Sequence, residues 1–220
     1  MTLRPPALLL AAAGAAALAG CVPYAVGSTA ATVAPREVEP RVVAQVTSAR
    51  RNLDRGDDGV GGVGLTVGNE ARLGLDPRSD IGVQILGLGS ITATYKRRLS
   101  GDVGGDEGLA LIVGGGVVGT SHLHAEATLV ASPGPVDVAG RVVPYGGVRV
   151  QDLFPFADDA RDTAPAVGVF AGGRFGWPDL ALSPELGVFY SPSPIQGTSD
   201  LVVVPSVTVR GERLVRALGL

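Results

Sequence analysis

The sequence predicts an all-β fold, a single antiparallel up-and-down β-barrel of about eight to ten strands that follows a flexible N-terminal tether. Glycine accounts for 33 of the 220 residues, about twice the usual share of roughly 7%. Together with 16 prolines, this composition argues against a helix-rich protein. Short segments of alternating polarity, separated by clusters of Gly, Pro, Asp and Ser, follow one another along most of the chain, which is the pattern of strands and turns.

The first 20 residues have the pattern of a secretory signal peptide. Arg4 supplies a positive charge, and residues 7–20 form an unbroken run of Ala, Leu and Gly. A helix that crosses a membrane needs roughly 20 apolar residues, so this run is too short to span the bilayer. We therefore expect residues 1–20 to be removed and the mature chain to begin at Cys21.

Residues 18–21, Leu-Ala-Gly-Cys, resemble the lipobox of bacterial lipoproteins. The resemblance implies that Cys21, the single cysteine of the chain, carries covalent lipid that includes palmitate. Two acyl chains make such anchoring stable, because each buried CH₂ contributes about 0.8 kcal/mol. Val22 follows where an aspartate favours the inner membrane in those lipoproteins, so the resemblance implies the outer membrane.

Residues 21–40 are predicted to form a flexible linker. Pro23, Pro35 and Pro40 lie among Gly, Ala, Ser and Thr in this range, and no two-residue or 3.6-residue period is sustained. The pattern changes near Arg41, so residues 41–220 are predicted to form the barrel domain.

About ten candidate strands follow, and several have the 9 to 11 residues that a tilted strand needs to cross a bilayer. They are predicted near Val38, Leu65, Asp80, Ile91, Leu109, His122, Val142, Val167, Leu180 and Leu201. In residues 90–99, one face is mostly apolar and the other is polar or charged, because alternate residues of a strand point to opposite sides. Residues 65–75, 121–131 and 180–190 repeat this division.

Two architectures fit strands with one apolar and one polar face. A membrane barrel would turn the apolar faces outward, whereas a soluble barrel would turn them inward. The apolar faces are built from Val, Leu and Ala, and the opposite faces are rich in Gly, Arg and Glu, which favours lipid contact outside and a narrow polar lumen inside. An aromatic girdle is predicted at the strand ends from Tyr95, Tyr145, Phe170, Phe175, Trp177, Phe189 and Tyr190.

Residues 71–83 (ARLGLDPRSDIGV) and 94–99 (TYKRRL) resemble the strand and turn motifs of small outer-membrane β-barrel proteins of Gram-negative bacteria, especially the lipid-tethered ones. The resemblance implies a lipid-anchored outer-membrane protein with a structural or interaction role and at most a narrow channel. Its partners would be outer-membrane lipid and envelope proteins. Residues 52–59, 152–163 and 191–199 are the candidate contact loops, since loops carry recognition.

Charged residues on the predicted inner face are expected to neutralise one another in a lumen filled by side chains, because buried charges need partners. This lumen charge network consists of Glu70, Arg72, Asp80, Lys96, Arg98, Glu126, Arg149, Arg174 and Glu185. A catalytic pair of carboxylates is the alternative interpretation of the same set.

The two histidines of the chain, His122 and His124, share a predicted strand face with Glu126. Such a set could chelate zinc or copper. The alternative is that these side chains are polar groups of the lumen or rim that hydrogen-bond to neighbouring residues.

No enzyme is predicted. Residues 114–119 (GGGVVG) match the G-x-G-x-x-G pattern, but a dinucleotide site needs a helix to begin there, and the residues that follow alternate as a strand does. A net charge of −3 without a basic cluster argues against nucleic acid. We expect no nucleotide and no cofactor other than the lipid on Cys21.

The alternative function is a soluble periplasmic β-barrel lipoprotein that binds an apolar ligand in its interior. This alternative requires the Val and Leu faces to point inward. Val83 and Gln84 distinguish the two, because they lie on opposite faces of one strand.

Overall fold

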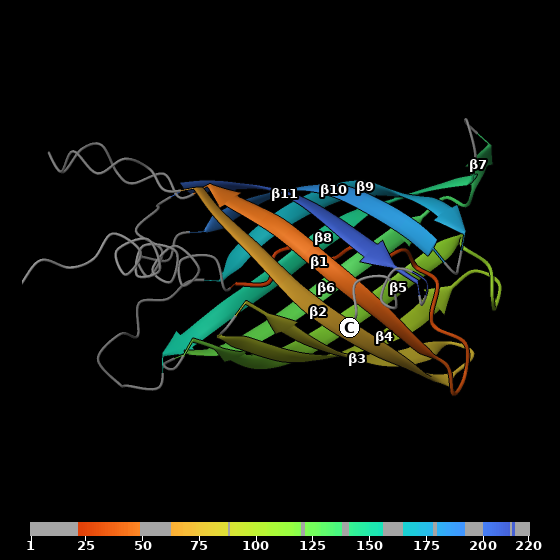
Figure 1. The fold of residues 1–220 in the computed structure, drawn as a ribbon, viewed down its shortest axis with the longest axis horizontal. Coiled ribbons are helices and arrows are strands. Elements are labelled where there is room, and N and C mark those ends of the chain that lie inside the picture. Colours follow the sequence, from red (N-terminus) through yellow and green to blue (C-terminus); the bar gives the residue numbers. More distant parts are fainter. Residues whose placement is uncertain are drawn as a thin grey trace, which may run out of the picture.

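The computed structural model describes residues 22–48, 63–87, 89–119, 122–137, 141–155, 165–177, 180–191, 200–211 and 213. Ten long strands in these ranges form a closed barrel (Figure 1). They are β1 (Val38–Ser48), β2 (Val63–Asp76), β3 (Ser79–Leu86), β4 (Ser90–Ser100), β5 (Gly108–Val118), β6 (His122–Ser132), β8 (Arg141–Pro155), β9 (Ala166–Trp177), β10 (Leu180–Ser191) and β11 (Asp200–Arg210). The two-residue strand β7 (Val136–Asp137) pairs with the start of β8.

Each long strand pairs in antiparallel fashion with its neighbours along the chain, and two further pairings are needed to keep the sheet closed. β6 pairs with β8 across the connection that holds β7, and β1 pairs with β11, so that Val42 lies opposite Val209. Closure removes the unpaired sheet edges that an open sheet would present. The all-β, antiparallel up-and-down barrel expected from the sequence is confirmed, with ten long strands in the described ranges.

The two longest connections lie at one end of the barrel, here called the long-connection end, and the opposite end is called the turn end. At the turn end, residues 77–78 join β2 to β3, and residues 178–179 join β9 to β10. At the long-connection end, residues 49–62 join β1 to β2 and residues 156–165 join β8 to β9. No helix among the described residues has the length and apolar character that crossing a membrane requires.

The apolar faces of the strands point outward. In β3, Val83 is 50% exposed, whereas Gln84 on the other face is only partly exposed. Each of the ten long strands contributes exposed Val, Leu, Ile, Phe, Tyr or Trp side chains. This orientation is opposite to the one that an apolar ligand-binding interior requires.

Three of the aromatic residues assigned to an outer girdle lie inside the barrel instead. Tyr145, Phe170 and Phe189 are buried and pack in small apolar clusters of the lumen. Phe175 and Trp177, in contrast, are exposed on the outer surface. The prediction failed for the inner three because the narrow lumen also needs large side chains to fill it.

Residues 22–35, here called the lumen segment, run through the interior of the barrel and differ from the flexible linker expected for residues 21–40 (Figure 1, red trace). The segment begins at the long-connection end, where Val22 packs against Val118 and Leu153. It reaches the turn end at Pro35, which bridges to Gly74. The chain then turns back at Arg36, whose φ is 68°, and enters β1.

Candidate functional site: the occupied lumen

Side chains of the barrel wall hold the lumen segment by its main chain. Near the long-connection end, the Gln45 Oε1 atom accepts hydrogen bonds from the amide nitrogens of Tyr24 at 3.1 Å and Ala25 at 3.2 Å. The Gln45 Nε2 atom donates to the Val22 carbonyl oxygen at 2.6 Å. A single amide side chain therefore satisfies both donors and acceptors of the segment, which is possible because Gln carries both kinds of group.

Arg149 binds the carbonyl oxygens of the same stretch. Its Nη1 atom donates to Pro23 at 3.0 Å, to Tyr24 at 2.8 Å and to Ala25 at 3.3 Å. Its Nη2 atom lies 2.7 Å from the Glu126 Oε2 atom. Glu126 thus fixes the guanidinium that caps these carbonyls, and the rigid fork of donors suits this double role.

Glu185 binds two consecutive amides in the middle of the segment. Its two carboxylate oxygens accept from the amide nitrogens of Val26 and Gly27, both at 2.8 Å. Hydrogen bonds to an ionised acceptor are roughly twice as strong as those between neutral groups. This contact therefore fixes the register of the segment within the barrel.

Lys96 and Asp80 hold the half of the segment that faces the turn end. The Lys96 Nζ atom donates to the Ser28 hydroxyl at 2.9 Å, to the Thr29 carbonyl at 2.6 Å and to the Ala31 carbonyl. The Asp80 Oδ2 atom accepts from the Val33 amide at 3.0 Å. An ammonium group has three protons to donate, and each finds an acceptor on the segment.

Lys96 and Glu185 have hydrogen-bond partners on the segment in place of a direct ion pair. Among the described residues, neither side chain lies within ion-pair distance of an opposite charge, and both are buried. Asp80 lies opposite Lys96 on the neighbouring strand, where it also binds Arg72. A buried ion needs partners, and the polar groups of the segment supply the hydrogen bonds.

Other members of the predicted charge network pair with each other. Arg72 lies 2.6 Å from Glu70 and 2.5 Å from Asp80, with its guanidinium between the two carboxylates. Arg174 lies 2.6 Å from Asp106, which comes from the connection between β4 and β5. These pairs lie toward the turn end of the lumen, and Asp106 is a member that the strand pattern could not reveal.

Arg98 occupies the expected face but makes different contacts. Its guanidinium donates to the carbonyl oxygens of Ser100 at 3.1 Å, Gly105 at 2.7 Å and Glu107. Among the described residues no carboxylate lies within ion-pair distance of it. Arg98 therefore fixes the backbone of the connection between β4 and β5 at the turn end.

The histidines are not gathered into a metal-binding arrangement. His124 is buried with its Nε2 atom 3.6 Å from the Glu126 Oε2 atom, and the same Glu126 oxygen binds Arg149. His122 is partly exposed at the end of β6. Within the described ranges, no group of three or more His, Cys, Asp or Glu side chains has an arrangement that could hold a metal ion.

The glycine-rich run at residues 114–119 lies mostly within β5 and not at a strand-to-helix turn. A Cβ atom on Gly116 would come within 2.0 Å of the Ile91 carbonyl oxygen. These glycines thus let neighbouring strands approach closely.

Sequence reasoning missed Arg41, Gln45 and the lumen segment itself. Arg41 and Gln45 are buried on the inner face of β1, and the alternation of residues 41–47 was the signal that could have found them. The segment contains no charged residue and is rich in Ala, Gly, Ser and Thr. Small uncharged residues fit a narrow interior, and this composition was the signal for the segment.

Several predicted features lie outside the described residues. These are Cys21 with the signal peptide before it, the contact loops at 52–59 and 192–199, and residues 156–163 of the third loop. Of the carboxylates considered for a catalytic pair, Glu70 and Asp80 both bind Arg72.

No protein-family model and no curated protein matches this chain. Similar chains occur among the solved structures. The crystal structure of Neisserial surface protein A has a TM-score of 0.39 and 14% identity, over 80% of this chain and 96% of that chain. A chain from the de novo design of transmembrane β-barrels has a TM-score of 0.34 and 13% identity, over 81% of this chain and 98% of that chain.

Proposed function

We propose that this protein is a lipid-anchored outer-membrane β-barrel with a structural or interaction role, and that its own N-terminal segment closes its lumen. The observation that carries the membrane-spanning part is the apolar outer surface, to which every long strand contributes. Soluble monomers rarely expose contiguous apolar patches larger than a few hundred Å². An apolar belt around a closed barrel is instead expected where the outer surface contacts lipid.

Strand length supports the same proposal. β4 has 11 residues, so it rises about 36 Å along its own direction at about 3.3 Å per residue. At a tilt of about 40°, it covers about 28 Å of membrane thickness, close to the roughly 25 Å apolar band of transmembrane barrels.

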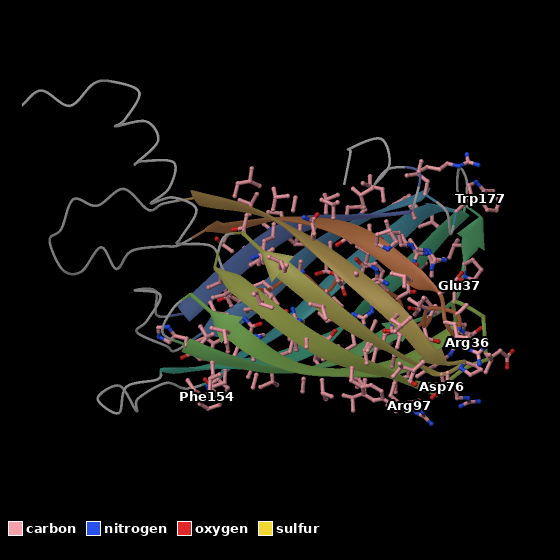
Figure 2. The ribbon with its side chains drawn as sticks, turned by 60° about the horizontal axis from the view of Figure 1, so that its bottom comes forward. Arg36, Glu37, Asp76, Arg97, Phe154 and Trp177 are labelled. Atoms are coloured by element: carbon pink, nitrogen blue, oxygen red, sulfur yellow. The ribbon has the colours of Figure 1, made fainter. Side chains whose placement is uncertain are left out.

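The outer surface changes character toward the ends of the barrel. Figure 2 places Asp76, Arg97 and Trp177 at one end and Phe154 at the other. Arg97, the charged exception on the outer face of β4, lies 3.3 Å from Asp76, and both side chains are 47% exposed. Charged pairs and exposed aromatic side chains at the ends suit the polar interface of a bilayer.

The occupied lumen argues against a free solute channel. The lumen segment runs from one end of the barrel to the other and is hydrogen-bonded to six wall side chains, which are Gln45, Asp80, Lys96, Ser132, Arg149 and Glu185. With the segment in place, function is expected to reside in the long connections and the outer surface. Lipid on Cys21 would add a second attachment to the membrane.

The test separates the barrel from the lipid. A Cys21→Ala variant with its secretory signal intact is expressed, its membranes are extracted with alkaline carbonate, and its gel mobility is compared with and without boiling. We expect the variant to stay in the membrane and to shift on heating, because the barrel itself spans the bilayer. Release as a soluble folded protein would overturn the membrane-spanning proposal.

The lipid has its own readout in the same cells. Radiolabelled palmitate is expected to enter the wild-type chain and not the Cys21→Ala variant. Equal labelling of both chains, or labelling of neither, would overturn lipidation at Cys21 and leave the barrel result unaffected.

A further inference from the structure

We propose that the barrel lumen is a binding site for an extended peptide, and that residues 22–35 are a tethered ligand that a separate peptide of the same sequence can replace. The peptide site does not require a membrane. The ion path described below rests on the proposed membrane-spanning function.

The wall recognises main-chain groups rather than side chains. Bonded amide nitrogens belong to Tyr24, Ala25, Val26, Gly27, Ala30 and Val33, and bonded carbonyl oxygens belong to Val22, Pro23, Tyr24, Ala25, Thr29 and Ala31. Lys96 also donates a hydrogen bond to the Ser28 hydroxyl. Such a pattern selects the backbone path of the peptide, and its hydrogen bonds recognise few side chains.

Space restricts which peptide fits. Gly27 has a φ of 54°, and a Cβ atom there would come within 2.0 Å of the Thr208 Oγ1 atom. Tyr24 is the one large side chain of the segment, and its ring packs against Phe189 with centroids 4.9 Å apart. The expected ligand class is therefore a small-residue, uncharged peptide with glycine in its middle and one aromatic side chain near its N-terminal end.

The covalent link between ligand and barrel is accessible. Arg36 and Glu37 are exposed in the turn that follows the segment, and Figure 2 shows both at the turn end. The hydrogen bonds between wall side chains and the main chain of the segment involve residues 22–33 only. Cleavage between Arg36 and Glu37 would therefore separate the ligand from the barrel without removing any of those contacts.

Departure of the segment would open the lumen to water. Lys96 and Glu185 would lose their hydrogen-bond partners on the segment, so water would enter to replace those groups. Lys96 and Glu185 would then line an ion path together with the ion pairs of Arg72 and Arg149. The segment would act as the plug of this path.

The experiment uses two preparations in detergent micelles. In the first, residues 22–35 are deleted. In the second, a site-specific protease sequence is inserted between Arg36 and Glu37, and the chain is folded first, cleaved, and washed with urea below the unfolding transition until mass spectrometry shows that the cut segment is lost, so that an emptied barrel is available even if the deletion chain does not fold. A fluorescent synthetic peptide of residues 22–35 is titrated into each, and its anisotropy is measured. Saturable binding of one peptide per barrel is expected, and no binding to either folded barrel would overturn the proposal.

Matched changes test the recognition. N-methylation of the peptide at Gly27 removes a donor to Glu185 and is expected to weaken binding at least about tenfold. N-methylation at Ala34, which is exposed, is the control. On the wall, Glu185→Gln is expected to weaken binding, whereas Glu70→Gln should not, because Glu70 pairs with Arg41 and Arg72. Equal effects within each pair would overturn the assigned contacts.

Planar-bilayer recording tests the plug. The emptied barrel is expected to conduct, and the peptide is expected to block that current. A folded, inserted barrel that binds the peptide but conducts equally with and without it would overturn the plug. Peptide binding in micelles without any insertion into bilayers would count against the membrane-spanning function and leave the peptide site standing.

Discussion

Gly27 of the lumen segment and Thr208 of β11 are in such close contact that a Cβ atom on Gly27 would lie 2.0 Å from the Thr208 hydroxyl oxygen and 2.7 Å from its Cβ atom. Rotation of the hydroxyl cannot relieve a clash with the Cβ atom. We expect Gly27→Ala to destabilise the folded barrel by about 1 to 3 kcal/mol, the usual cost of overpacking. Urea unfolding in lipid vesicles, followed through the fluorescence of Trp177, measures the change.

Gly119→Ala is the control for backbone strain. Gly119 has a φ of 63°, and a Cβ atom there would meet nothing within 4 Å. Both substitutions force alanine into the left-handed region, so the difference between them reports the contact with Thr208. Equal losses of stability would contradict the assigned contact.

Asp80→Asn should be strongly destabilising. Asp80 is fully buried and binds both the Arg72 guanidinium and the Val33 amide. We expect a loss of about 3 kcal/mol, at the lower end of the cost of breaking a buried pair, since Glu70 still neutralises Arg72. Asp76→Asn breaks the exposed pair with Arg97 and should have a much smaller effect. Similar effects of the two substitutions would be inconsistent with a buried pair of Asp80 and Arg72.

Val113→Arg tests which surface meets lipid. Val113 is exposed near the middle of β5, so arginine there is expected to cost about 2 to 4 kcal/mol, as at the bilayer midplane. Val38, equally outward-facing but at the first residue of β1, provides the control, and Val38→Arg should cost about 1 kcal/mol or less. If the two variants unfold from vesicles at the same urea concentration, the apolar belt is not in contact with lipid.

Val22→Cys reports the direction in which the segment threads the barrel. Val22 lies at the long-connection end, whereas Val103 is exposed in the connection at the turn end. In transmembrane barrels the short turns face the periplasm and the longer loops face outward. In a Cys21→Ala background, a membrane-impermeant thiol reagent applied to intact cells is therefore expected to label Val22→Cys and not Val103→Cys.

The opposite labelling pattern would mean that the barrel has the opposite orientation in the membrane. Labelling of both positions from outside would mean that the barrel is not inserted. If Val22 is reached from outside, acyl chains on the preceding residue would enter the outer leaflet. The lipid and the long connections would then share one face of the membrane.

Much of the barrel could be predicted from local pattern, and the site only in part. Glu185 and Lys96 were assigned correctly to the inner face, but their partners were expected among charged side chains. Their partners are instead amides and carbonyls of residues 26–31. Every residue carries backbone amide and carbonyl groups, so no sequence pattern indicates which of these groups hydrogen-bond to a charged side chain far away in the chain.

The sequence by itself determined which side of each strand is apolar, because side-chain direction in an extended chain depends only on whether a position is odd or even. Only the tertiary structure decided what occupies the lumen. Residues 22–35 have no period, and their place depends on hydrogen bonds to residues 20 to 159 positions away. Those partners come together only when β1 pairs with β11 and β6 with β8, since closure of the barrel brings side chains from distant strands around one interior.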